Sequence, residues 1–176
     1  MKKVMLLTIF AALMLISSAA VAQTATGTLT VTATVNGSIQ LVFNSDAAGV
    51  ALSSGAGTNT ATLAFGNVSA FGAISAGIVR STTATTFTVS SAVDVLVSKT
   101  NSASANYTLK AQLGAADAVN TWSVGGVGVT NAAQSTVTAT GAYAANSNFP
   151  VAITVPFTTA SGTLISNTIN YTATAN

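Results

Sequence analysis

The chain of 176 residues contains no cysteine, no histidine and no glutamate, and its only acidic residues are three aspartates. Without cysteine there is no disulfide, no thiolate nucleophile and no ligand for an iron–sulfur cluster. Without histidine the chain lacks the commonest imidazole base and the usual zinc ligand. We therefore expect no catalytic site, no cofactor and no metal site in this protein.

Hydrolysis would need an acid/base pair among Asp46, Asp94 and Asp117, which lie far apart in the sequence. They do not form the clustered aspartate motif of a calcium loop. Serine and threonine are abundant, but a hydroxyl needs an adjacent base to become a nucleophile, and the chain has no Ser-x-x-Lys motif. A hydrolase is therefore the least favoured interpretation, and we predict that the protein is not an enzyme.

The amino terminus has the pattern of a secretion signal. Lys2 and Lys3 precede an apolar run over residues 4–16, and residues 20–22 form an Ala-Val-Ala cleavage site. The apolar run is too short to anchor the chain across a bilayer. We predict a signal peptide over residues 1–22, passage through the periplasm, and a mature protein at the cell surface or outside the cell, without a membrane span.

Removal of 22 residues leaves 154, which suits one domain. The mature chain keeps three basic residues and three aspartates, so its formal net charge is zero. No basic patch remains to bind nucleic acid. A neutral, threonine-rich surface is poorly protected against self-association, which in a secreted protein can serve assembly.

The strongest pattern lies directly after the signal. From position 29 to 43 every odd residue is apolar except Gly37, and from 28 to 42 every even residue is polar except Val42. Such alternation predicts a strand with one apolar face. The pattern exceeds the usual strand length of about 3–10 residues. It indicates either two strands end to end or one strand that reaches beyond its own domain to complete a neighbour's sheet.

The remainder of the chain shows no helical periodicity. Short segments of strand character separated by turn residues predict an all-β, immunoglobulin-like β-sandwich. The predicted strands cover residues 60–68, 85–99, 107–113, 121–130, 135–143, 149–157 and 165–173. Pro150 and Pro156 predict an edge position or bulged pairing for 149–157. The glycine-rich residues 125–128 indicate a hairpin or bulge, because no helix follows as a phosphate-binding loop would require.

Two polar or aromatic features have both a binding and a structural interpretation. The threonines at 28, 30, 32 and 34 could match a lattice of ice or polysaccharide, but they suit the solvent face of a strand better. The aromatic residues Tyr107, Trp122 and Tyr143 could stack on a sugar, but each is single on its own segment. We expect these aromatic side chains in the core.

Three segments together resemble a known family. Residues 26–35 look like the amino-terminal donor segment of archaic chaperone–usher pilins, the spore coat protein U family. Residues 63–66, Leu-Ala-Phe-Gly, look like its early strand, and residues 162–171 look like its closing strand. The chain departs from that family in lacking a cysteine pair, in having Leu164 and Asn167 at two motif positions, and in running on to Asn176.

The resemblance implies an incomplete immunoglobulin-like sandwich over residues 37–176 that lacks its final strand. A periplasmic chaperone would fill the gap first, and at the outer-membrane usher the donor strand of the next subunit, residues 23–36, would replace it. The inserted side chains would be Leu29, Val31, Ala33 and Val35. The acceptor groove would include Ile165, Ile169 and Tyr171. Identical or related subunits would then join head to tail into a pilus or fimbrium that serves adhesion or biofilm, this chain more as shaft than tip.

The alternative is a self-complete secreted β-sandwich that binds carbohydrate or belongs to a surface or biofilm matrix. In that case the strand over residues 29–35 pairs within its own sheet. The position of these residues therefore separates the two interpretations.

Overall fold

The computed structural model describes residues 26–176. The predicted signal peptide, residues 1–22, and the first three residues of the predicted donor segment lie outside the described residues. The described part contains strands and no helix, so the all-β prediction is confirmed. No helix among residues 26–176 has the length and apolarity to cross a membrane. Residues 35–176 form one compact unit.

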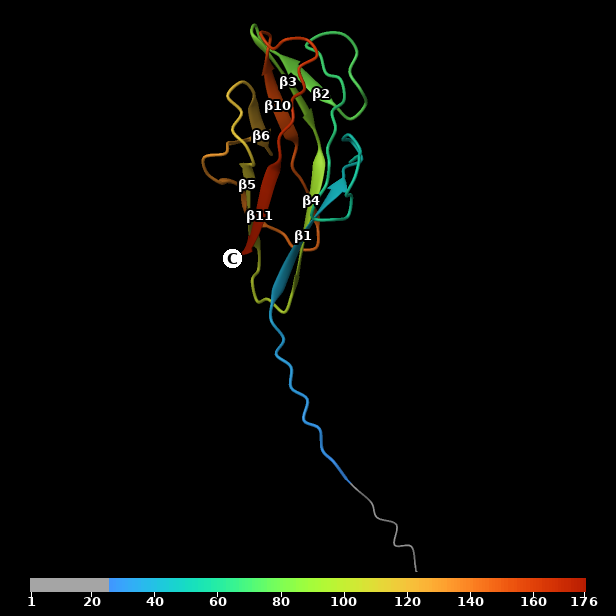
Figure 1. The fold of residues 1–176 in the computed structure, drawn as a ribbon, viewed down its shortest axis with the longest axis vertical. Helices are drawn as coiled ribbons and strands as arrows, with labels where there is room; N and C mark the ends of the chain where they lie inside the picture. Colours follow the sequence, from blue (N-terminus) through green and yellow to red (C-terminus); the bar gives the residue numbers. More distant parts are fainter. Residues whose placement is uncertain (1–25) are drawn as a thin grey trace, which may run out of the picture. The chain divides into compact units, whose positions relative to one another are not determined.

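The strands form three antiparallel sheets (Figure 1). The first sheet has the order β1 (Ser38–Ser45), β4 (Val93–Thr100), β9 (Asn146–Asn148). The second has the order β2 (Val79–Thr82), β3 (Thr86–Ser91), β10 (Val151–Pro156), β6 (Thr121–Val124), β7 (Val127–Val129). The third has the order β11 (Ile169–Ala175), β5 (Tyr107–Leu113), β8 (Ser135–Gly141).

The predicted strand over residues 85–99 divides at Ala92, so that β3 and β4 belong to different sheets. The loop before Val50 approaches the chain closely at this break. A Cβ on Gly49 would lie 2.2 Å from the carbonyl oxygen of Ala92, and the Ser91 hydroxyl accepts a 2.7 Å hydrogen bond from the Val50 amide. The loop therefore packs directly against the point where the chain changes sheets.

The prediction of a strand over residues 60–68 is wrong. The segment contributes only an isolated bridge between Ser54 and Thr62. The Thr58 hydroxyl donates to the carbonyl oxygens of Gly55 and Thr60, which folds the preceding chain into local turns. Its apolar side chains Leu63 and Phe65 still face inward, half-buried, so the alternation marks a covered face rather than a ladder.

The prediction of an edge position or bulged pairing for residues 149–157 is wrong. Strand β10 lies inside its sheet, between β3 and β6, with regular pairing on both sides. Pro150 precedes the strand and Pro156 is its last residue. Because both prolines lie at the ends, the missing N–H groups interrupt no central ladder bond.

The predicted strand over residues 121–130 divides into a hairpin of β6 and β7, one of the two structures that the glycine-rich sequence indicated. Trp122 on β6 pairs with Val129 on β7, and Val124 pairs with Val127. The two turn residues, Gly125 and Gly126, have φ angles of 58° and 80°. Two consecutive positive φ values are what a type I′ turn requires, and glycine adopts them without strain.

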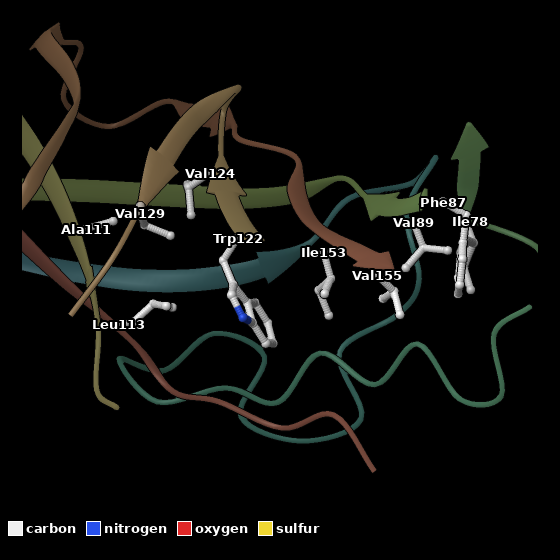
Figure 2. Packing of buried hydrophobic residues seen from close by; sticks show 10 residues of the cluster. All are labelled: Ile78, Phe87, Val89, Ala111, Leu113, Trp122, Val124, Val129, Ile153 and Val155. Carbon is white, nitrogen blue, oxygen red and sulfur yellow. The ribbon is translucent and has the colours of Figure 1, made fainter. Parts of the chain in front are cut away.

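The buried side chains form two clusters. Figure 2 shows the larger, with Trp122, Ile153 and Val155 pointing the same way from neighbouring strands of the five-stranded sheet. The smaller cluster contains Val95, Val97, Tyr107 and Leu109. Since Tyr107 and Trp122 are both buried, the sugar-stacking interpretation is wrong for them.

Candidate functional site: an open groove between two edge strands

Strands β1 and β11 lack the cover that their neighbours β4 and β5 have. Among residues 26–176, β1 pairs in its sheet with β4, and β11 pairs with β5, each along one side. The inward side chains of β4 and β5 are buried, whereas those of β1 and β11 are only half-buried. Apolar surface that would be removed from water by one more strand is therefore left partly open between these two edges.

A groove of about 1080 Å³ lies between the two edges. Ile165, Ile169 and Tyr171, the residues predicted for an acceptor groove, all line it. Sequence reasoning missed the opposite wall and the floor, which come from β1, from the segment before residue 66 and from the core. The apolar residues contributed there are Ile39, Leu41, Phe43, Leu52, Leu63, Phe65, Val93, Trp122, Val151 and Ile153.

Phe43 on β1 and Tyr171 on β11 meet across the groove. Their rings pack edge to face with centroids 5.1 Å apart. Burial raises the pKa of the Tyr171 hydroxyl above its ordinary value, so this residue stays neutral in the groove. The aromatic pair links the two sheet edges without a backbone hydrogen bond.

The two edges differ in how much backbone they leave open. The Phe43 amide donates a 2.8 Å hydrogen bond to the Thr58 carbonyl, and the Gly57 amide donates a 2.7 Å bond to the Phe43 carbonyl. The outer edge of β1 is thus covered at Phe43. On the other side, an uninterrupted run from Ile165 to Tyr171 lines the groove. The edge of β11 and the residues just before it offer the longer template for an added strand.

Asp117 holds the tryptophan of the groove floor in place. Its carboxylate accepts a 2.8 Å hydrogen bond from Nε1 of Trp122 and further bonds from the amides of Val119 and Asn120. Burial alone would raise the pKa of Asp117, but the bonds donated by Asn120, Trp122 and Val119 outweigh it and lower the pKa to about 2. Asp117 therefore has a structural role, since its carboxylate fixes the indole of Trp122.

The other two aspartates lie together, although the sequence suggested isolated carboxylates. The Asn148 side-chain amide donates to Asp46 at 2.8 Å and to Asp94 at 3.4 Å. Burial, followed by the neighbouring Asp46 charge, raises the pKa of Asp94. Asp117 does not join them, and within residues 26–176 no three acidic side chains gather into a metal-binding group.

The predicted donor residues lie on an exposed segment that forms no strand. No residue from 26 to 37 belongs to a strand, and β1 begins at Ser38, so the long alternation does not form a continuous strand in this chain. Leu29 and Val31 are 88% and 80% exposed, and Val35 is 74% exposed. Ala33 is exposed as well. Apolar residues that alternate on an extended segment and stay in water have the pattern of a strand without a partner.

In comparisons with protein families, curated proteins and solved structures, nothing matches this chain. Membership of the spore coat protein U family therefore stays a prediction from the motifs, and the functional case depends on the groove and the donor segment.

Proposed function

We propose that this protein is a secreted structural subunit of a surface fibre or pilus that polymerises by donor-strand exchange. Residues 37–176 form an incomplete immunoglobulin-like sandwich, and the missing strand comes from residues 23–36 of another copy. Leu29, Val31, Ala33 and Val35 insert, and Ile165, Ile169 and Tyr171 receive them. Head-to-tail contacts of this kind do not close on themselves, so they generate filaments.

The observation that carries this proposal is the groove of about 1080 Å³ between the edges of β1 and β11. Its lining comes from all three sheets and combines polar side chains, such as Asn59 and Asn167, with apolar ones, among them the core residues Trp122 and Ile153. A single extended strand suits an open sheet edge beside apolar side chains, because it satisfies backbone groups and covers those side chains together.

The donor segment has the composition that such a site needs. Each large aliphatic side chain that is fully buried against the apolar part of the groove contributes about 1.5–3 kcal/mol. Leu29, Val31 and Val35 are exposed and available for that transfer. The polar residues between them would stay on the solvent side of the inserted strand, where threonine is favourable.

The partners follow from the same chemistry. An open groove in a single copy favours aggregation, so a periplasmic chaperone would cover it until an outer-membrane usher brings two copies together. The self-complete alternative has less support, since residues 26–37 form no strand and two of the three aromatic candidates for sugar stacking are buried.

Trp122 offers a direct test because it is the only tryptophan and it lines the groove. We expect the fluorescence of mature protein, residues 23–176, to change with concentration as donor segments fill grooves in trans. Val31→Asp should abolish the change, because it places a charge on the apolar face. Thr32→Asp is the matched control, since its side chain points to the opposite face. Equal loss in both variants, or no concentration dependence in the wild type, would contradict the proposal.

A further inference from the structure

An exposed aromatic pair lies at one end of residues 35–176. The rings of Phe71 and Phe157 have centroids 6.0 Å apart, and Phe157 also stacks on Phe87 at 6.3 Å. Phe71 is 72% exposed and Phe157 is 40% exposed. The loops that carry them precede β2 and follow β10, and in Figure 1 these loops lie at the end opposite the start of β1.

The Phe71 loop is held rather than left free. The guanidinium of Arg80 donates hydrogen bonds to the carbonyl oxygens of Ser69, at 2.9 Å, and Gly72, at 2.8 Å. The Ser69 hydroxyl donates a 2.7 Å bond to the Phe71 carbonyl. Gly72 has a φ of 88°, which glycine allows. Exposed apolar side chains that lie next to one another, as the rings of Phe71 and Phe157 do, mark interaction surfaces more often than single ones.

The direction of an inserted donor strand follows from the two edges. β1 and β11 run in opposite directions (Figure 1), so a strand between them is antiparallel to one and parallel to the other. Gly57 and Thr58 cover β1 at Phe43, so β11 and the residues from Ile165 onward offer the longer open edge. Antiparallel pairing is the more stable arrangement. The carboxyl end of the donor strand therefore leaves the groove beyond the start of β11, toward the Phe71–Phe157 pair.

The connector between donor strand and domain is short. Only Asn36 and Gly37 separate Val35 from Ser38, the first residue of β1. The chain from Val35 to Ser38 spans about 10 Å when it is extended. A Cβ on Gly37 would lie 2.7 Å from the carbonyl oxygen of Asn101, so the connector passes close to the turn after β4. Because the connector is short, the donating domain must lie directly against the accepting domain.

From these observations we infer that the Phe71–Phe157 pair is a docking surface for a second copy of this chain. The copy that donates its strand presses the end carrying the start of β1 and the turn over residues 101–106 against the two rings. This inference rests on the proposed donor-strand joint and adds its direction and a second contact, which fixes the angle between successive subunits.

The absence of native cysteine allows a clean test with mature protein. Two cysteine variants with tags of different size, Ala103→Cys and Ala73→Cys, are mixed and treated with a short bismaleimide. Both positions are exposed, and Ala73 lies two residues from Phe71. We expect a crosslinked heterodimer that disappears when Val31→Asp is added to the Ala103→Cys chain. Adding Phe71→Ser to the Ala73→Cys chain should lower the yield several-fold without changing the Trp122 fluorescence response.

The control replaces Ala73→Cys with Ala139→Cys. Ala139 lies at the other end, where its carbonyl oxygen accepts a 2.8 Å hydrogen bond from Asn176. Crosslinking of 103 to 139 would show that the donor strand enters in the reverse direction and would overturn the inference. Failure of 103 to crosslink to 73 while Trp122 still reports insertion would overturn it and leave the proposed function intact. If the Trp122 fluorescence of the wild type does not change with concentration, both the inference and the proposed function are contradicted.

Discussion

The ring of Phe43 packs edge to face against the ring of Tyr171, and this contact joins the edge of one sheet to the edge of another across an open groove. The two residues lie 128 positions apart and no backbone ladder connects their strands. The pair therefore sets the width of the groove at the point where both edges come together.

Removing the Tyr171 ring should weaken both the domain and its capacity to accept a strand. Tyr171→Ala removes the aromatic contact with Phe43 and leaves a cavity, at a cost of about 3 kcal/mol, the low end for aromatic truncation since the groove side is already open. Tyr171→Phe keeps the ring contact and should stay within about 1 kcal/mol of the wild type. Urea unfolding measures both variants, and equal stability of the two would contradict the role given to the ring.

Asp117 predicts a pH dependence with a definite sign. Its folded pKa of about 2 lies below the ordinary aspartate value of 3.8, so its contribution to stability is present above pH 4 and is lost as the pH falls toward 2. Asp117→Asn removes this charge and should cost about 1 kcal/mol at pH 5.5, where the carboxylate is partly screened by solvent.

The measurement is urea unfolding of wild type and Asp117→Asn at pH 5.5 and pH 2.5. We expect the difference in unfolding free energy to shrink at pH 2.5. The comparison isolates Asp117, because the raised pKa of Asp94 acts in the opposite direction in both proteins. A difference that stays constant or grows at low pH would contradict the assignment.

A single methyl group at position 141 should be costly. A Cβ on Gly141 would lie 2.2 Å from Cζ of Tyr107, whose side chain is fully buried. Gly141→Ala therefore overpacks the smaller cluster and should destabilise by about 1–3 kcal/mol. Gly128→Ala is the control, because a Cβ there has no neighbour within 4 Å, and it should change stability by less than about 0.5 kcal/mol. Thermal melting of both variants measures the difference. Similar melting temperatures for Gly141→Ala and Gly128→Ala would contradict close packing at position 141.

The resemblance of residues 162–171 to a closing strand predicted one side of the groove and missed the other. Ile165, Ile169 and Tyr171 could be named because they lie on or beside the segment that carries the resemblance. Phe43 and Trp122 enter the groove only through the order of strands in the sheets, which no local pattern encodes.

Tertiary context also decided the elements that the sequence predicted incorrectly. β10 lies inside its sheet because its prolines fall at the strand ends, and a pattern that counts prolines without their position cannot detect this. Asp46 and Asp94 share Asn148, a contact made between residues far apart in the chain. In contrast, the hairpin at Gly125 and Gly126 depends on local backbone preference, and the sequence alone narrowed this segment to a hairpin or a bulge.

The central claim is that the groove accepts the donor segment, and thermal melting of residues 37–176 tests it most directly. The domain is melted alone and with a synthetic peptide of residues 24–36. A peptide that binds only the folded state raises the melting temperature as its concentration increases. The account predicts a large rise with the native peptide and none with the peptide carrying Val31→Asp. A domain that is already stable and melts at the same temperature with and without the native peptide would contradict donor-strand exchange.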